Sequence, residues 1–186
     1  KTGLNLVCAA GMYTEGMGIP YSFARMNVNE IVDIYVKEIE DGIAWSGIRA
    51  GVIKIATGEG QVTDFERKAL TAAARAARVL TGARIGSAVR FDGELLHMVG
   101  FHGTSPEAEA AMRAAFPMKP GKGSLNARAI AAGVPMQIPD VFLDPDYQLE
   151  DVARKAQYRS LLVVPMIHEG RAIGAIGLGR DEPGPY

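Results

Sequence analysis

Residues 84–102, RIGSAVRFDGELLHMVGFH, decide the fold, because they have the pattern of two β-strands joined by a tight turn. The two apolar arms, 84–91 and 94–102, are separated by Asp92-Gly93. An Asp-Gly pair between such arms is the strongest short-range signal for a β-hairpin. We therefore predict antiparallel pairing in this part of the chain.

The chain before this hairpin follows a different pattern, in which predicted strands and helices alternate. Short apolar runs at 4–10 and 50–56 predict buried strands, and the amphipathic stretch 29–43 between them predicts a helix. Thr63, followed three residues later by a glutamate, forms a capping box that opens an Ala-rich helix over 63–81. The strand–helix–strand order predicts a parallel strand pair, so this part has an α/β pattern.

The chain after the hairpin has an α+β pattern, with antiparallel strands and separate helices. Helices are predicted over 106–116, 124–132 and 147–158, with an edge strand over 135–141 and a second hairpin whose arms are 160–167 and 171–180. The whole chain therefore combines an α/β segment with an α+β domain.

Composition excludes several classes of protein. The 186 residues hold 20 Lys plus Arg and 21 Asp plus Glu, a net charge of −1 that argues against nucleic acid as the main partner. The longest run of large apolar residues, Leu161 to Ile167, is too short to cross a membrane, so we expect no membrane partner. The single cysteine, Cys8, cannot form an intrachain disulfide, and we expect a cytoplasmic location.

The first part of the chain carries the segments TGLNLVC, EIVDIYVKEIEDGI, GIRAGVIKIATG and TDFERKALTAAARAA. Through these segments, residues of about 1–81 resemble phosphotriesterase-related proteins of the amidohydrolase superfamily. The resemblance implies that they are consecutive βα units of a TIM-type barrel. It also implies that Lys54 is the carbamylated lysine that bridges two divalent metals, zinc or manganese.

The histidines that such a metal pair requires are missing from this part of the sequence. Residues 1–96 contain no histidine, and His97 and His102 differ in strand parity, so they would point to opposite faces of a regular strand. We therefore expect the phosphotriesterase-like segment to be inactive and to need no cofactor. Lys54 would bridge metals only in a hydrolase completed by further regions, and is otherwise a solvated or ion-paired strand lysine.

The second part carries the segments RIGSAVRFDGELLHMVGFHG, GKGSLNARAIAAGVPMQIPDV and YRSLLVVPMIHEGRAIGAIGLGR. Through them, residues of about 65–186 are similar to GAF domains, the small-molecule-sensing modules of bacterial signalling proteins. The resemblance implies an antiparallel sheet with flanking helices, here without the usual C-terminal helix. It divides the chain into a segment 1–64 and a domain 65–186, with the junction inside the helix 63–81.

A sensing domain of this kind holds its ligand in an apolar cavity with a few polar groups. Aromatic and methionine side chains at these spacings also serve as ordinary core residues. The candidate residues for lining the pocket are Phe101, Met118, Ile138, Phe142, Tyr147, Tyr158 and Met166.

Three functions remain open at this stage. The first is a non-catalytic sensor of an unknown small molecule that carries a truncated phosphotriesterase-like segment. The second is a metal-dependent ester, lactone or phosphotriester hydrolase. The third is a dimerisation scaffold without a ligand, whose partner is a second copy of the chain in a homodimer. The strands 4–10 and 50–56 are expected to pair with the GAF-like sheet or with another chain, and the helix 29–43 is expected to cover apolar surface left by the missing helix.

Overall fold

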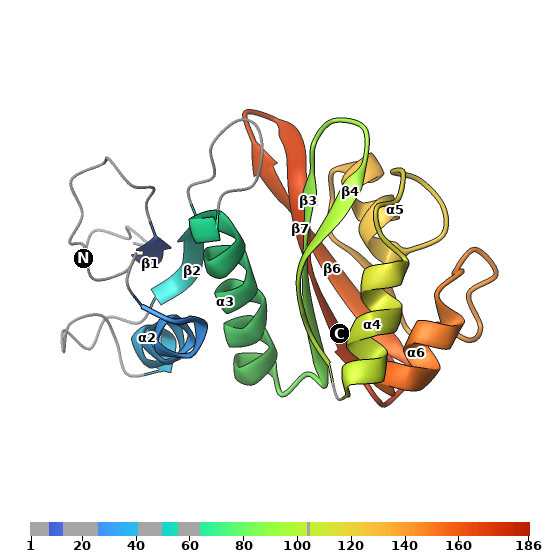
Figure 1. Cartoon of the computed structure of the whole chain (residues 1–186), viewed down its shortest axis with the longest axis horizontal. Helices are drawn as coiled ribbons and strands as arrows, with labels where there is room; N and C mark the ends of the chain where they lie inside the picture. The colour runs from blue at the N-terminus through green and yellow to red at the C-terminus, as the bar shows by residue number, and fades with distance from the viewer. Residues whose placement is uncertain (1–7, 13–25, 41–49, 56–63, 104) are drawn as a thin grey trace, which may run out of the picture.

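A five-stranded antiparallel sheet forms the centre of the chain in the computed structural model, which describes residues 8–12, 26–40, 50–55, 64–103 and 105–186 (Figure 1). The spatial order of the strands is β4-β3-β7-β6-β5. Their bounds are β3 Ile85–Phe91, β4 Leu96–His102, β5 Met136–Ile138, β6 Ser160–His168 and β7 Arg171–Arg180. Both predicted hairpins and the predicted edge strand are present, and the antiparallel GAF-like sheet is confirmed.

The turn between β3 and β4 differs from the predicted two-residue turn. The Asp92 side chain accepts hydrogen bonds from the backbone N–H groups of Glu94 and Leu95, each at 2.8 Å. These bonds hold a four-residue loop, so β4 begins at Leu96 and not at Glu94. The tighter turn is the one between β6 and β7, where Glu169 and Gly170 both have positive φ.

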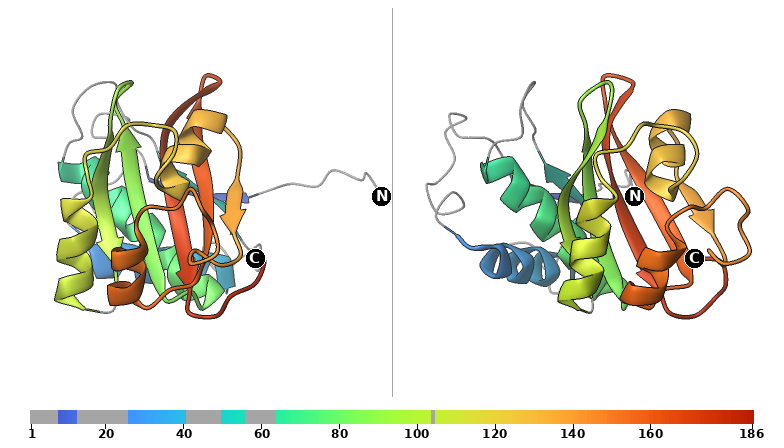
Figure 2. Two further views of the ribbon diagram at one scale, coloured as in Figure 1. Left: turned by 90° about the vertical axis from the view of Figure 1, so that its right-hand side faces the viewer. Right: turned by 45° about the vertical axis from the view of Figure 1, so that its right-hand side comes forward.

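Helices cover both faces of this sheet (Figure 2). One face carries α3, Asp64–Thr81, and the other carries α4, Pro106–Ala114, α5, Leu125–Ala132, and α6, Glu150–Ala156. Ser105 and Ser124 cap α4 and α5 by accepting a hydrogen bond from a backbone N–H three residues later, at 3.1 Å in each case. The helix α6 begins three residues later than predicted, because the Tyr147 N–H bonds to the Asp144 carbonyl instead of entering a helix.

The helix α3 lies unusually close to the sheet, because glycines face it on β3 and β4. A Cβ atom at Gly86 would lie 2.6 Å from the Ala74 carbonyl oxygen, and one at Gly100 would lie 2.4 Å from Thr71 Oγ1. The buried cluster between α3 and the sheet consists of Leu70 and Ala74 from α3, Ala88 from β3 and Val99 from β4. Only residues without side chains permit this approach of helix and sheet backbones.

The opposite side of α3 packs against α2, Val28–Glu40. The cluster between the two helices consists of Ile31, Val32 and Tyr35 from α2 and Ala69, Ala72 and Ala76 from α3. Both long sides of α3 are therefore buried, one by the sheet and the other by α2. The predicted amphipathic stripe of α2 is the side that faces α3.

The strands β1, Cys8–Met12, and β2, Ala50–Ile55, form a separate parallel pair. This confirms the predicted parallel pairing, although β1 is described from Cys8, and residues 4–7 of the predicted strand lie outside the described residues. Within the described chain, neither strand joins the five-stranded sheet. We call β1, α2 and β2 the amino-terminal unit and residues 64–186 the sheet domain; the barrel origin of the unit stays a prediction.

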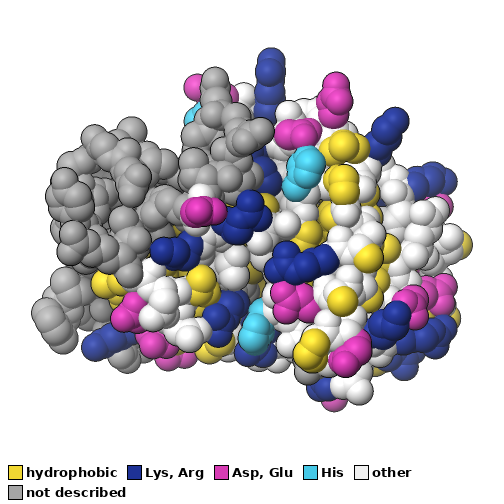
Figure 3. Space-filling view, viewed as in Figure 1, with side chains coloured by type: hydrophobic (Ala, Val, Ile, Leu, Met, Phe, Trp, Pro, Cys, Tyr) yellow, Lys and Arg dark blue, Asp and Glu magenta, His cyan; other side chains and the backbone are white. Residues whose placement is uncertain are grey.

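The main core lies between the sheet and the helices α4, α5 and α6. Basic and acidic side chains are interspersed over the face seen in Figure 3, as the nearly balanced charge of the sequence leads one to expect. None of the helices in the described part of the chain is long and apolar enough to cross a bilayer.

Candidate functional site

Six of the seven residues predicted to line a pocket belong to one side of the sheet. Phe101, Ile138, Tyr147 and Tyr158 are at most 6% exposed and lie in the main core. Met118 and Phe142 are partly buried and pack against the same core. Six of these candidates therefore gather where α4, α5 and α6 cover the sheet.

The seventh candidate, Met166, lies on the opposite face of the sheet. Its side chain packs against the cluster that α3 makes with the sheet, near Gly174. Side chains alternate between the two faces along a strand, and Val163, three positions before Met166 on β6, belongs to the main core. The structure thus separates Met166 from the other six candidates.

A pair of tyrosine hydroxyl groups lies inside this apolar core. The hydroxyl oxygens of Tyr147 and Tyr158 are 2.6 Å apart and buried. Burial raises the pKa of both phenols, that of Tyr147 well above its usual range, so both stay neutral near pH 7. Each hydroxyl has the other as its hydrogen-bond partner, and the pair joins the loop before α6 to the residues that follow it.

A second polar group in the core, Asn126, was not predicted from the sequence. Its side chain is 8% exposed at the start of α5, and its Oδ1 has no hydrogen-bond partner among the described residues. A Cβ atom at Gly177 would lie 3.4 Å from this oxygen and 2.6 Å from Ser87 Oγ, so both side chains lie beside Gly177. An unpaired buried amide oxygen is costly unless something else bonds to it. The one signal in the sequence was a polar residue inside the apolar run LNARAIAA.

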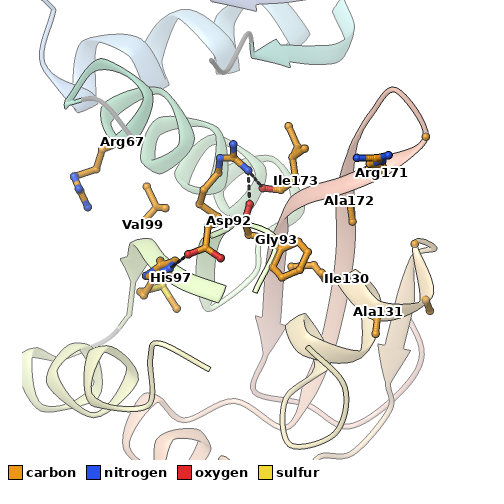
Figure 4. Close-up of a pocket in the computed structure, with 16 residues that line it drawn as sticks. Arg67, Asp92, Gly93, His97, Val99, Ile130, Ala131, Arg171, Ala172 and Ile173 are labelled. Atoms are coloured by element: carbon orange, nitrogen blue, oxygen red, sulfur yellow. Dashed lines mark hydrogen bonds and ion pairs between the residues drawn. The ribbon is translucent and has the colours of Figure 1, made fainter. Parts of the chain in front are cut away.

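A large open cleft lies at one end of the sheet domain, with a volume of about 1320 Å³ (Figure 4). Four elements line it: the first turns of α3, the β3–β4 hairpin, the C-terminal end of α5 and the β6–β7 hairpin. The ionisable residues of its lining are Arg67, Arg90, Asp92, His97 and Arg171. Three arginines thus face one carboxylate in this cleft.

The centre of this cleft is ordered by hydrogen bonds. Arg90 Nη1 donates to the carbonyl oxygens of Phe91 and Ile173, at 2.5 and 2.6 Å, which ties the two hairpins together. Asp92 Oδ2 lies 2.7 Å from His97 Nε2. Backbone N–H groups of the loop, and then His97, hold the pKa of the Asp92 carboxyl well below its usual range. Asp92 is therefore ionised throughout the physiological range.

A smaller cavity of about 470 Å³ lies beside α6, with the predicted residues Phe142 and Tyr158 in its lining. The Arg154 guanidinium lies over the Phe142 ring, 4.6 Å from its centre. The arginines here are already paired: Arg154 with Glu150 at 3.1 Å, Arg84 with Asp181 at 3.3 Å, and Arg159 with Asp140. This cavity therefore offers aromatic and apolar surface more than available charge.

The described residues do not fit a dinuclear metal centre. Lys54 lies on β2 opposite Gly11 of β1. Among the described residues, no group of three His, Cys, Asp or Glu side chains is placed to hold a metal ion. The three histidines of the chain all belong to the sheet domain, and His97 is engaged by Asp92.

Curated relatives and solved structures resemble this chain. A phosphotriesterase homology protein of Mycobacterium tuberculosis is 40% identical over 93 residues, which are 46% of this chain and 28% of the relative. An aryldialkylphosphatase of Saccharolobus solfataricus is 36% identical over 73 residues, 39% of this chain and 23% of the relative. The chain thus spans about a quarter of the length of these relatives.

The solved structures resemble this chain in its fold. The GAF domain of a phosphoenolpyruvate-protein phosphotransferase from Coxiella burnetii aligns with a TM-score of 0.54 at 17% identity, over 84% of this chain and 79% of that one. The type II free methionine-R-sulfoxide reductase of Thermoplasma acidophilum aligns with a TM-score of 0.53 at 20% identity, over 66% and 79%. At these identities the likeness concerns the fold.

Two family models match overlapping parts of the chain. The phosphotriesterase family matches residues 1–95, and the GAF domain family matches residues 63–186, so the two matches share α3 and β3. The chain therefore belongs to the phosphotriesterase family through its first half and to the GAF domain family through residues 63–186.

Proposed function

We propose that this chain is a non-catalytic regulatory module whose sheet domain senses a small molecule. The ligand binds between the sheet and α4, α5 and α6, where six of the predicted pocket residues gather. The phosphotriesterase-like segment acts as a packing element, with α2 covering the outer side of α3. The module needs no cofactor of its own.

The observation that carries this proposal is the unpaired Oδ1 of Asn126 inside an apolar core. A purely structural core avoids such a group, because burying an amide oxygen without a partner costs about 1–3 kcal/mol. A ligand with a hydrogen-bond donor would supply the missing partner. The Tyr147–Tyr158 hydroxyl pair gives the same region a second fixed polar point, as specific small-molecule sites usually have.

The test is a thermal-shift screen of the full chain with nucleotides, haem and organic acids, repeated on the variant Asn126→Leu. A ligand that binds the folded state raises the melting temperature. In Asn126→Leu we expect an unchanged or higher melting temperature without ligand, because an unpaired polar atom is removed, and loss of the ligand-induced rise. The exposed Leu143→Ala variant should keep the rise. A ligand shift that Asn126→Leu leaves intact would contradict this site.

The phosphotriesterase match over residues 1–95 supports a second candidate, a metal-dependent hydrolase completed by regions outside this sequence. In that case Lys54 would help to hold zinc or manganese. Metal analysis of the purified chain, with Lys54→Ala as the comparison, tests it directly. Near-stoichiometric metal that the variant loses would favour the hydrolase; no metal above background in either protein would favour the sensor. Light scattering of the same samples tests whether the chain forms the homodimer expected of a dimerisation scaffold.

A further inference from the structure

We infer that the cleft at the hairpin end of the sheet domain is a second binding site, which takes an organic anion with an apolar body. This site is distinct from the interior site of the proposed function. Neither Asn126 nor any of the six candidate residues of the interior site lines it, and its residues come from α3, both hairpins and the end of α5.

The charges of the lining favour an anion. Arg67 and Arg171 lie on different sides of the cleft, the first on α3 and the second on the β6–β7 hairpin (Figure 4). Neither guanidinium forms an ion pair with another described residue. A guanidinium binds carboxylate and phosphate oxygens through paired hydrogen bonds, and such bonds are about twice as strong as neutral ones.

The one acidic residue of the lining does not cancel this preference. Asp92 Oδ1 accepts two backbone hydrogen bonds from the hairpin loop, and Oδ2 bonds to His97. Its negative charge is therefore directed at the loop and the imidazole. The Arg90 guanidinium, placed between the two hairpins, adds a further positive charge to the lining.

The walls of the cleft favour a ligand with an apolar body over a bare inorganic ion. The lining includes the apolar residues Ile130 and Ala131 from α5 and Ala172 and Ile173 from β7, and Val99 lies near Arg67 (Figure 4). A cleft of about 1320 Å³ is far larger than an inorganic anion needs. Apolar contact adds affinity in proportion to the area removed from water.

The smaller cavity beside α6 lacks this combination. Its three arginines are each paired with a carboxylate, Arg84 with Asp181, Arg154 with Glu150 and Arg159 with Asp140. An anion there would have to displace an existing partner. The cleft at the hairpin end is the place among the described residues where arginines without an ion-pair partner meet apolar walls.

The experiment measures binding of three probes to the full chain at low salt by calorimetry: octanoate, octylamine and acetate. We expect octanoate to bind more tightly than both others, because it alone combines the anion with the apolar body. Arg67→Gln and Arg171→Gln should each weaken octanoate binding about tenfold or more, as the loss of one hydrogen bond to a charged group does. Higher ionic strength should weaken it further.

The matched control is Arg113→Gln, on α4, whose guanidinium pairs with Glu109 away from the cleft; it should leave octanoate binding unchanged. Ala172→Glu, which adds a carboxylate to the apolar wall, should abolish binding while circular dichroism confirms the fold. Equal affinity for octanoate and octylamine, or no effect of either arginine variant, would overturn the inference. Asn126→Leu should not affect octanoate binding, so failure of the interior site and failure of this cleft give different results.

Discussion

In the sheet domain, apolar side chains from five strands and three helices meet in one continuous core, whereas the described cluster of α2 lies against a single helix, α3. The main core includes large residues such as Leu96, Leu125 and Tyr158. The cluster of the amino-terminal unit has Ile31, Val32 and Tyr35 against three alanines.

This difference predicts which part of the chain determines the global free energy of unfolding and which part can open locally. A core to which many elements contribute side chains unfolds cooperatively, and therefore determines the global free energy of unfolding. A helix whose described buried cluster is small and is shared with one other helix can open locally at a lower cost. The amino-terminal unit should thus open before the sheet domain unfolds, and truncations of similar chemistry in the two regions should have different consequences.

The largest effect is expected from Leu96→Ala in the sheet domain. Leu96 is 0% exposed, and its truncation should lower the global free energy of unfolding by about 3 kcal/mol. Urea denaturation followed by circular dichroism measures this loss. The control is Leu143→Ala, the same change at a side chain that is 80% exposed, which should stay within about 0.5 kcal/mol of the parent.

Ile31→Ala is the corresponding change in the amino-terminal unit. Ile31 is also 0% exposed, and we expect a local loss of about 2 kcal/mol. Hydrogen exchange should speed up at the amides of α2 and remain unchanged in β3 and β7. The exposed Lys37→Ala variant serves as the control. Equal acceleration in both regions would show that the two unfold as one unit and would break the comparison.

The ion pair of Arg128 and Asp144 provides a second test of whether a change in the sheet domain leaves α2 unaffected. Its two hydrogen bonds are both 2.8 Å long, and both side chains are at most 20% exposed. Asp144→Asn should cost about 1.5 kcal/mol at pH 7 and leave exchange in α2 unchanged.

The same pair predicts a pH dependence with a definite sign. The Arg128 guanidinium holds the pKa of the Asp144 carboxyl below its usual value. The stabilisation is therefore present above the unfolded pKa, near about 4, and is lost as the pH falls through the lower folded pKa. Denaturation at pH 7 and pH 2 should show the difference between parent and Asp144→Asn at pH 7 and a much smaller one at pH 2.

The smallest effect is expected from Tyr158→Phe, which leaves the Tyr147 hydroxyl without its partner and should cost about 1 kcal/mol. The parent should lose stability as the pH rises above about 10, because the unfolded phenols ionise there while the folded ones, with raised pKa, stay neutral. Ultraviolet titration should show both phenols protonated until the chain unfolds. Ionisation of all six tyrosines near pH 10 in the folded state would contradict this.

Local sequence patterns were enough to predict most elements of the fold. The two hairpins, the edge strand and the parallel pair follow from apolar alternation, short apolar runs and turn residues, and all are present. The exact turn between β3 and β4 could not be predicted, because the Asp92 side chain competes with the backbone for the N–H groups of Glu94 and Leu95.

The candidate sites were predicted less completely, for a physical reason. The cleft brings together residues such as Arg67, Arg90, Ile130 and Arg171, whose spacing in the sequence follows no local period. Such a site exists only once the elements have packed. Met166 was grouped with the pocket candidates by residue type, whereas its strand position places it on the α3 side of the sheet.

The glycines at positions 86 and 100 bring α3 into backbone contact with the two strands of the first hairpin. A gap filled by long, flexible side chains would absorb small displacements, but a close-packed seam of backbone and methyl groups cannot. A change in the twist of β3 and β4 should therefore move α3 as a rigid body. Because α2 packs against the far side of α3, we expect strain in the first hairpin to shift α2 as well, through the cluster between the two helices.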